Sequence, residues 1–104
     1  MNSTILKYLP MQSIDSATLT GGYQIFTGAS PFTEACFKVT VTNASDKPVT
    51  ISFDGVTDAF AVGAGLFYDL SLQLISDVLV AKGTLPKIKG SAGTGNIYLS
   101  AFYV

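Results

Sequence analysis

Apolar and polar side chains alternate along several segments of the chain, most clearly over residues 35–43. One face of this segment carries Ala35, Phe37, Val39 and Val41, and the other carries Cys36, Lys38, Thr40 and Thr42. A period of two residues is typical of a half-buried β-strand, because successive side chains point to opposite faces. We therefore predict a strand over residues 35–43, and its branched valine and threonine side chains suit a pleated surface.

The same alternation predicts further strands along the rest of the chain. They cover residues 49–53, 60–64, 66–74, 77–83, 87–90 and 96–104. Residues 14–20 alternate more weakly, and Gly21-Gly22 is a tight turn from them into YQIFTG (23–28). The composition of 66–74 also suits an amphipathic helix, but its strict alternation favours a strand. The closing segment, 96–104, is apolar or aromatic on both faces, which is typical of a strand that is central in its sheet or meets a partner.

Turn residues separate the predicted strands. Asp54-Gly55 ends the strand over 49–53, and Gly21-Gly22 and Ser91–Gly95 have the glycine content of hairpin connections. About eight short strands joined by such turns are typical of a β-sandwich. The predicted fold is therefore all-β: a single β-sandwich, jelly-roll-like, with about eight short antiparallel strands.

The length of 104 residues fits one domain. We assign residues 14–104 to the sandwich and residues 1–13 to an N-terminal arm or edge segment. Pro10 argues against a helix through this segment. Two interpretations of it stay open: an arm that pairs with a neighbouring subunit, and a frayed or surface-packed terminus.

Charge is scarce in this sequence. Hydrophobic residues make up 48% of the chain and charged residues 12%, which is about half the usual share of charge. One small sandwich has little room to hide so much apolar surface, so we expect part of it to be buried against another chain. A homo-oligomer is expected, with a trimer among the candidates.

Missing residue types exclude several functions. The chain has no histidine to act as a catalytic base or zinc ligand, and its single cysteine, Cys36, is expected to behave as a small apolar residue. It also has no arginine and a net charge of −1. Both features disfavour binding to nucleic acid, because such binding depends on positively charged side chains that contact phosphate groups. We expect no enzyme activity, no cofactor and no nucleic-acid partner.

The N-terminus and the hydropathy pattern bear on the location of the protein. The segment before Gln12 lacks a basic region and is broken by Lys7 and Pro10, unlike a signal peptide. No apolar run approaches the length of a membrane span. The expectation is a soluble protein, made in the cytoplasm, with no membrane partner.

Two groups of residues resemble chemical sites. Asp54 and Asp58, with Glu34, could act as paired carboxylates, but turn capping explains Asp54 more simply. Asp54 and Asp58 are also the candidates for a calcium site, although the loop lacks the ligand pattern of an EF-hand. The segment Gly90–Gly95 resembles a phosphate loop only in its glycine content, and a hairpin connection is the expected alternative.

From Val41 onward, the order of features resembles small bacteriophage virion structural proteins. The matching segments are VTNASDKPVTISFDGVTDAFAVGAG (41–65), LFYDLSLQL (66–74) and KGTLPKIKGSAGTGNIYLSAFYV (82–104). One departure is Leu85-Pro86, where similar sequences carry a polar turn. The resemblance implies a structural role in a phage particle and no catalytic residues.

This resemblance and the low charge lead to one preferred function. We expect a non-enzymatic phage virion protein, either a capsid decoration (cement) protein or a minor capsid protein, that contacts other virion proteins. The alternative is a neck, tail or fibre component that acts as an adaptor or binds a receptor or glycan. The predicted interface residues lie on the closing strand and are Ile97, Tyr98, Leu99, Phe102 and Tyr103.

Overall fold

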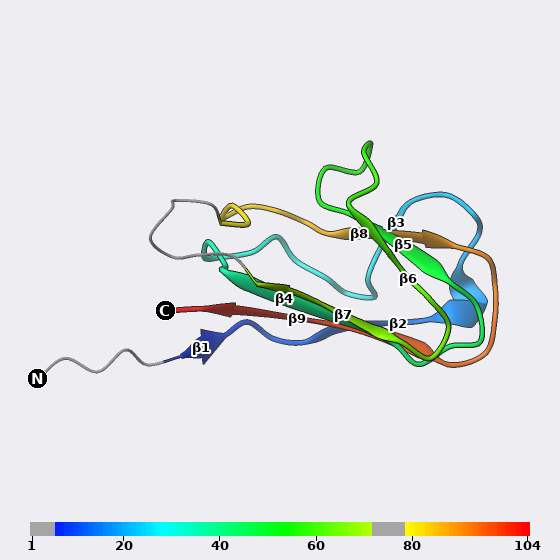
Figure 1. Ribbon diagram of the computed structural model, residues 1–104. Helices are drawn as coiled ribbons and strands as arrows, with labels where there is room; N and C mark the ends of the chain where they lie inside the picture. Colours follow the sequence, from blue (N-terminus) through cyan, green and yellow to red (C-terminus); the bar gives the residue numbers. More distant parts are fainter. Residues whose placement is uncertain (1–5, 72–78) are drawn as a thin grey trace, which may run out of the picture.

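A computed structural model describes residues 6–71 and 79–104 of the chain. Two antiparallel sheets pack face to face as a sandwich (Figure 1). Sheet A consists of β1 (Lys7–Tyr8), β2 (Gln12–Asp15), β4 (Lys38–Asn43), β7 (Phe67–Ser71) and β9 (Asn96–Tyr103). Sheet B consists of β3 (Gln24–Ile25), β5 (Val49–Ser52), β6 (Phe60–Val62) and β8 (Lys87–Gly90). The described residues form no α-helix, and a short 3-10 turn, η1 (Ser16–Thr18), follows β2.

The strands pair in a nested order. The order in sheet A is β1-β9-β4-β7, with β2 also on β9, and the order in sheet B is β3-β8-β5-β6. Strands from the first half of the chain therefore pair with strands from the second half: β2 with β9, β3 with β8, β4 with β7, and β5 with β6. This wrapped arrangement of a five-stranded and a four-stranded layer is a jelly roll, which confirms the predicted fold class.

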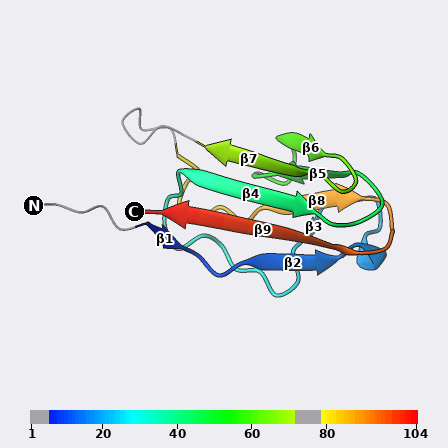
Figure 2. The same ribbon diagram turned by 60° about the horizontal axis from the view of Figure 1, so that its bottom comes forward.

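The core lies between the two sheets. Val39 and Val41 of β4 face Val49 and Ile51 of β5 across the sandwich interior, and all four are almost completely buried. These inward positions are the ones that the alternation predicted. β9 is central in sheet A, since β4 lies on one side of it and β1 and β2 lie on the other (Figure 2). Its central position is one of the two interpretations that its apolar character on both faces left open.

Two of the predicted hairpin connections are instead crossings between the sheets. Gly21-Gly22 joins β2 of sheet A to β3 of sheet B, and Ser91–Gly95 joins β8 of sheet B to β9 of sheet A. Asp54-Gly55 does lie in a hairpin, because β5 and β6 are neighbours in sheet B. Turn residues predict where a chain reverses, but not whether the next strand pairs with the one before it.

Two predicted strands are shorter in the structure. The predicted strand over 35–43 begins only at Lys38, because Cys36 forms an isolated bridge with Val80. The bridge turns Cys36 into the core and leaves Phe37 half-buried, so the predicted faces are wrong at these two positions. Within 79–83 the structure has this single bridge at Val80 and no longer strand. The rest of that predicted strand, and the end of 66–74, lie outside the described residues.

The N-terminal segment pairs with the chain's own last strand. β1 lies against the end of β9, the N–H of Leu9 donates to the carbonyl of Ala101 at 3.0 Å, and β2 lies against the start of β9. Pro10 separates the two short strands, as expected for a residue without an N–H to donate. The boundary proposed between residues 13 and 14 falls inside β2, and residues 1–5 lie outside the described part of the chain.

Candidate interaction surface

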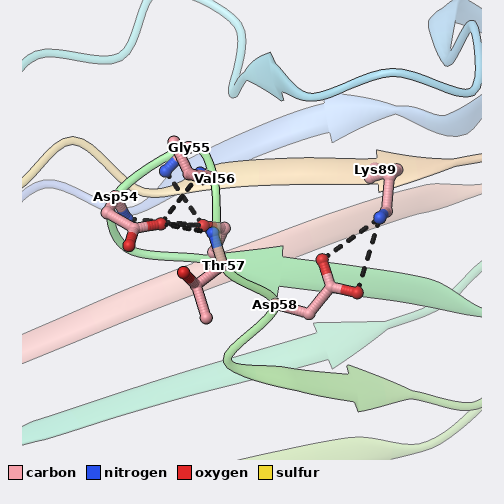
Figure 3. A network of polar contacts seen from close by, with 7 residues as sticks. Asp54, Gly55, Val56, Thr57, Asp58 and Lys89 are labelled. Carbon is pink, nitrogen blue, oxygen red and sulfur yellow. Dashed lines mark hydrogen bonds and ion pairs between the residues drawn. The ribbon is translucent and has the colours of Figure 1, made fainter.

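The acidic loop between β5 and β6 is organised by one carboxylate. Oδ1 of Asp54 accepts hydrogen bonds from the N–H of Val56 at 2.8 Å, from the N–H of Thr57 at 2.7 Å and from the hydroxyl of Ser52 at 2.9 Å (Figure 3). Gly55 adopts a positive φ of 77° within the same turn, a conformation that glycine accepts without strain. Asp54 therefore acts as a turn cap, the role that the sequence favoured for it.

The second aspartate of this loop has a different partner. Asp58 forms an exposed ion pair with Lys89 of β8, with 3.1 Å between Nζ and Oδ1. Figure 3 shows Asp54 turned into its own loop and Asp58 turned toward Lys89. The structure therefore does not direct the two carboxylates, our calcium candidates, toward a common point. Among the residues it describes, no three metal-ligating side chains form a cluster, and Glu34 lies on another loop, between β3 and β4.

Hydrogen bonding lowers the pKa of the Asp54 carboxyl group. The N–H groups of Thr57 and Val56 and the hydroxyl of Ser52 stabilise the carboxylate and lower its pKa from 3.8 to about 2. A group with a lowered pKa stabilises the fold above its unfolded pKa, and this contribution is lost as the pH falls through the folded value. The contribution of Asp54 is thus present above pH 3.8 and disappears toward pH 2.

This pH dependence can be measured with the Asp54→Ala variant. We expect the variant to unfold at lower urea concentration than the wild type at pH 6, and the difference to shrink near pH 2.5 because the wild type then loses the same contribution. Asp58→Ala is the control, since its ion pair with Lys89 is exposed and expected to add little. The double variant should still fold. A gap between wild type and Asp54→Ala that stays constant with pH would contradict this role.

One broad face of sheet A points away from the core. Side chains that are paired across antiparallel strands share a face, so the register places three cross-strand rows on this side. The rows are Tyr8, Phe102, Lys38 and Ser71; then Ser100, Thr40 and Asp69; then Ser13, Tyr98, Thr42 and Phe67. We call these residues, together with Met11, the outer face; Figure 2 looks onto this side of sheet A.

Exposed aromatic groups and few charges characterise the outer face. Tyr8 is 73% exposed and Phe67 is 71% exposed, at opposite margins of the sheet. Between them, a shallow open hollow of about 300 Å³ is lined by Met11, Thr40, Thr42, Tyr98 and Ser100. The charged groups on the rows, Lys38 and Asp69, form an exposed ion pair at 3.6 Å. A broad, nearly neutral face with exposed aromatic groups suits contact with another protein.

Of the five predicted interface residues on β9, only those on the outer face can contact a partner in this fold. The side chains of Ile97 and Leu99 are 0% and 1% exposed in the core, so they cannot contact a partner while the chain keeps this fold. Tyr103 also packs against the core, from a half-buried position. Tyr98 and Phe102 point outward on the outer face, and for them the interface stays a prediction.

Sequence reasoning missed Tyr8, Met11 and Phe67, which contribute most of the exposed apolar groups of this face. Phe67 lies in the alternating segment 66–74, opposite in phase to Tyr68 and Leu70, so its phase placed it on the polar side. A large apolar residue on the polar side of a strand was the available signal. Tyr8 and Met11 lie in a segment without a period, where no such signal exists.

A second hollow and a buried thiol lie outside the outer face. A second hollow of about 210 Å³ lies between Leu9–Gln12 and Thr27–Thr33, and no acidic or basic side chain lines it. Cys36 is buried, and burial, together with the charge of Glu34, raises the pKa of its thiol. The thiol therefore stays protonated at neutral pH, which agrees with the expected role as a small apolar residue. No helix in the described part of the chain has the length and apolarity to cross a bilayer.

Comparisons with known proteins identify a shared fold. No protein-family profile matches the sequence, and no curated protein matches it either. A chain in the cryo-EM structure of the virus-like particle of extra small virus, from the giant freshwater prawn Macrobrachium rosenbergii, is similar with a TM-score of 0.51 and 13% identity. The alignment covers 98% of this chain and 81% of that one. At this identity the similarity shows the β-sandwich fold.

A second solved structure is more distant. AlgX of Pseudomonas aeruginosa has a TM-score of 0.44 and 16% identity, over 93% of this chain and 26% of its own. The match thus involves about a quarter of AlgX, and no functional statement follows from it.

Proposed function

We propose that this chain is a non-enzymatic structural protein of a virus particle. The observation that carries the proposal is the jelly roll itself, whose nested pairing runs from β1 to β9. The same fold, over 98% of the chain, occurs in a component of a virus-like particle. Because one fold can serve many functions, the outer face provides the second support: it offers exposed aromatic groups for contact with neighbouring subunits.

The finer assignment is to a bacteriophage capsid. Here the chain is a decoration (cement) protein or a minor capsid protein, made in the host cytoplasm and located in the virion. The sequence features over 41–65 and 82–104 that resemble phage virion proteins support this assignment. The outer face of sheet A contacts other virion proteins, and packing of sandwiches between subunits stabilises the particle.

Purified particles test the proposal directly. Mass spectrometry of virions should detect the protein in a fixed ratio to the major capsid protein, and labelled antibody should bind the head. Absence from the particle would refute a virion role. Labelling confined to the neck, tail or fibres would refute the capsid assignment and favour the adaptor or receptor-binding alternative.

The outer face can be tested with a charge substitution. Tyr8→Glu places a carboxylate on the outer face at a position that is 73% exposed, so the fold should survive while incorporation into particles falls. Val56→Glu is the matched control, because Val56 is 82% exposed on the acidic loop, away from the outer face. Equal incorporation of the two variants would contradict the role of the outer face.

A further inference from the structure

The free edge of β7 is the longest unpaired strand edge among the described residues. β7 ends sheet A beside β4 (Figure 2), and four of its five residues are exposed. The other edge strands are shorter: β2 has four residues, and β1, β3 and β6 have two or three each. β7 also has no lysine, no proline and no positive φ, and its one charged side chain, Asp69, is ion-paired with Lys38 of β4. It therefore lacks most of the devices that usually prevent strands from pairing at an edge.

The hydrogen-bonding phase of β7 follows from its pairing with β4. The N–H of Asn43 donates to the carbonyl of Leu66 at 2.9 Å, and the register runs from Thr42 opposite Phe67 to Lys38 opposite Ser71. In an antiparallel pair, bonded and non-bonded positions alternate. The backbone groups of Tyr68 and Leu70 therefore point toward β4, and those of Phe67 and Asp69 point to the free edge.

We propose that a second copy of this chain adds to this edge, with the two β7 strands antiparallel about a two-fold axis at Tyr68. The two-fold axis is perpendicular to the sheet. The outer faces of the two copies then form one continuous surface, provided that residues directly opposite each other have their side chains on the same side of the sheet. Centring the pair on Asp69 would place two carboxylates directly opposite each other, which is unfavourable. Centring it on Tyr68 pairs Phe67 with Asp69 of the second copy and separates the two charges.

This register is self-complementary in two ways. Phe67 and Asp69 both direct their N–H and C=O groups outward, so each copy offers a donor and an acceptor at both positions of the bonded pairs. On the inner side, Leu66 of one copy lies opposite Leu70 of the other, and the two Tyr68 side chains meet. Leu66 is 61% exposed and Tyr68 is 39% exposed in the single chain, so the contact buries apolar surface.

An aromatic cluster holds the Tyr68 side chain in place within the single chain. The ring of Tyr68 lies against that of Phe60 with 4.2 Å between centroids, and Phe60 meets Phe53 edge-on at 6.1 Å. The tyrosine is therefore supported from sheet B, and it is in place before a second copy arrives. The partner that fits this edge is an antiparallel strand whose inward and outward side chains alternate in register with those of β7. The β7 strand of a second copy meets both conditions.

In a virus particle, this contact would join neighbouring subunits. That role rests on the proposed function. Its test uses the purified protein alone. A monomeric protein that is present in virions would refute the β7 contact and leave the virion role intact. A dimeric protein that is absent from virions would do the reverse.

The first experiment blocks the edge. Asp69→Pro removes an N–H that points to the free edge and spares the ladder with β4, a position where an edge strand accepts proline. We expect light scattering to detect a wild-type dimer, and the dissociation constant of Asp69→Pro to rise by at least about tenfold. Asp69→Ser is the matched control, because it removes the charge and keeps the N–H, so it should still dimerise. Circular dichroism verifies that each variant is folded.

The second experiment tests the register by disulfide formation in a Cys36→Ala background. Tyr68→Cys places two cysteines opposite each other in a non-bonded pair, where side chains are closest, so it should form a cross-linked dimer under mild oxidation. Asp69→Cys and Leu70→Cys, each alone, should not. A monomeric wild type, dimerisation of Asp69→Pro equal to that of Asp69→Ser, or cross-linking through Asp69→Cys in place of Tyr68→Cys would overturn the proposal.

Discussion

Replacing Asn43 by leucine is expected to lower the free energy of unfolding by about 3 kcal/mol, although leucine has a similar size. The Asn43 side chain is 0% exposed at the end of β4. Its amide nitrogen donates to the carbonyls of Lys47 at 2.8 Å, Val62 at 3.1 Å and Gly63 at 3.2 Å. Its carbonyl oxygen accepts from the backbone N–H and the hydroxyl of Ser45. Leucine leaves these groups without the side-chain partner that they have in the wild type.

These hydrogen bonds join the two sheets at one end of the sandwich. Asn43 belongs to sheet A, whereas Val62 ends β6 in sheet B. The loss should therefore appear as a cooperative decrease in stability, with a melting temperature lower by roughly 15 °C for a domain of this size. Thermal unfolding followed by circular dichroism measures it.

Two further variants decide the cause. Asn43→Asp keeps the shape and loses the donor, so it should be at least as destabilised as the leucine variant at neutral pH. Asn96→Ala removes an exposed asparagine from β9 and should change stability by less than about 0.5 kcal/mol. If Asn43→Leu were as stable as Asn96→Ala, the hydrogen bonds of Asn43 would not hold the sheets together.

The buried positions in the middle of β4 and β5 could be predicted from the sequence, because alternation indicates which side of a regular strand is buried. Val39, Val41, Val49 and Ile51 lie in the core as their phase indicated. The pairing of the strands could not be predicted in the same way. Alternation gives the side of a strand that is buried, but the partner of a strand depends on contacts between residues far apart in the chain. The crossings at Gly21-Gly22 and Ser91–Gly95 show this limit.

The candidate site shows the same division. The cap formed by Asp54 was predictable, because it bonds its own loop within three residues. The role of Asn43 was not, since two of its partners are 19 and 20 residues away in sequence. On β9, both faces are apolar, so composition could not separate the buried Leu99 from the outward-facing Tyr98. The interface prediction therefore combined residues of both faces.

Replacing Gly95 is the second change for which we expect a large loss of stability, because two loops approach each other closely at this residue. Gly95 has a φ of +107° in the crossing from β8 to β9, a conformation that other residues rarely adopt. A Cβ added there would lie 2.9 Å from the Cα of Ser45 and closer still to the carbonyl oxygen of Ala44. Hydrogen bonds hold the neighbouring backbone in place, from Ala44 N–H to the Asn96 carbonyl at 2.9 Å and from Asp46 N–H to the Thr94 carbonyl at 3.1 Å.

Gly95→Ala should therefore destabilise the fold through both strain and overlap, by about 3 kcal/mol in total. Gly83→Ala separates the two causes, because Gly83 has a φ of +91° and open space around its Cβ position. It carries only the conformational strain, for which we expect about 1 kcal/mol. Urea unfolding of the two variants beside the wild type gives both values. Equal losses would show that the two loops separate easily, and that the crossing from sheet B to sheet A is not held by its contact with residues 44–46.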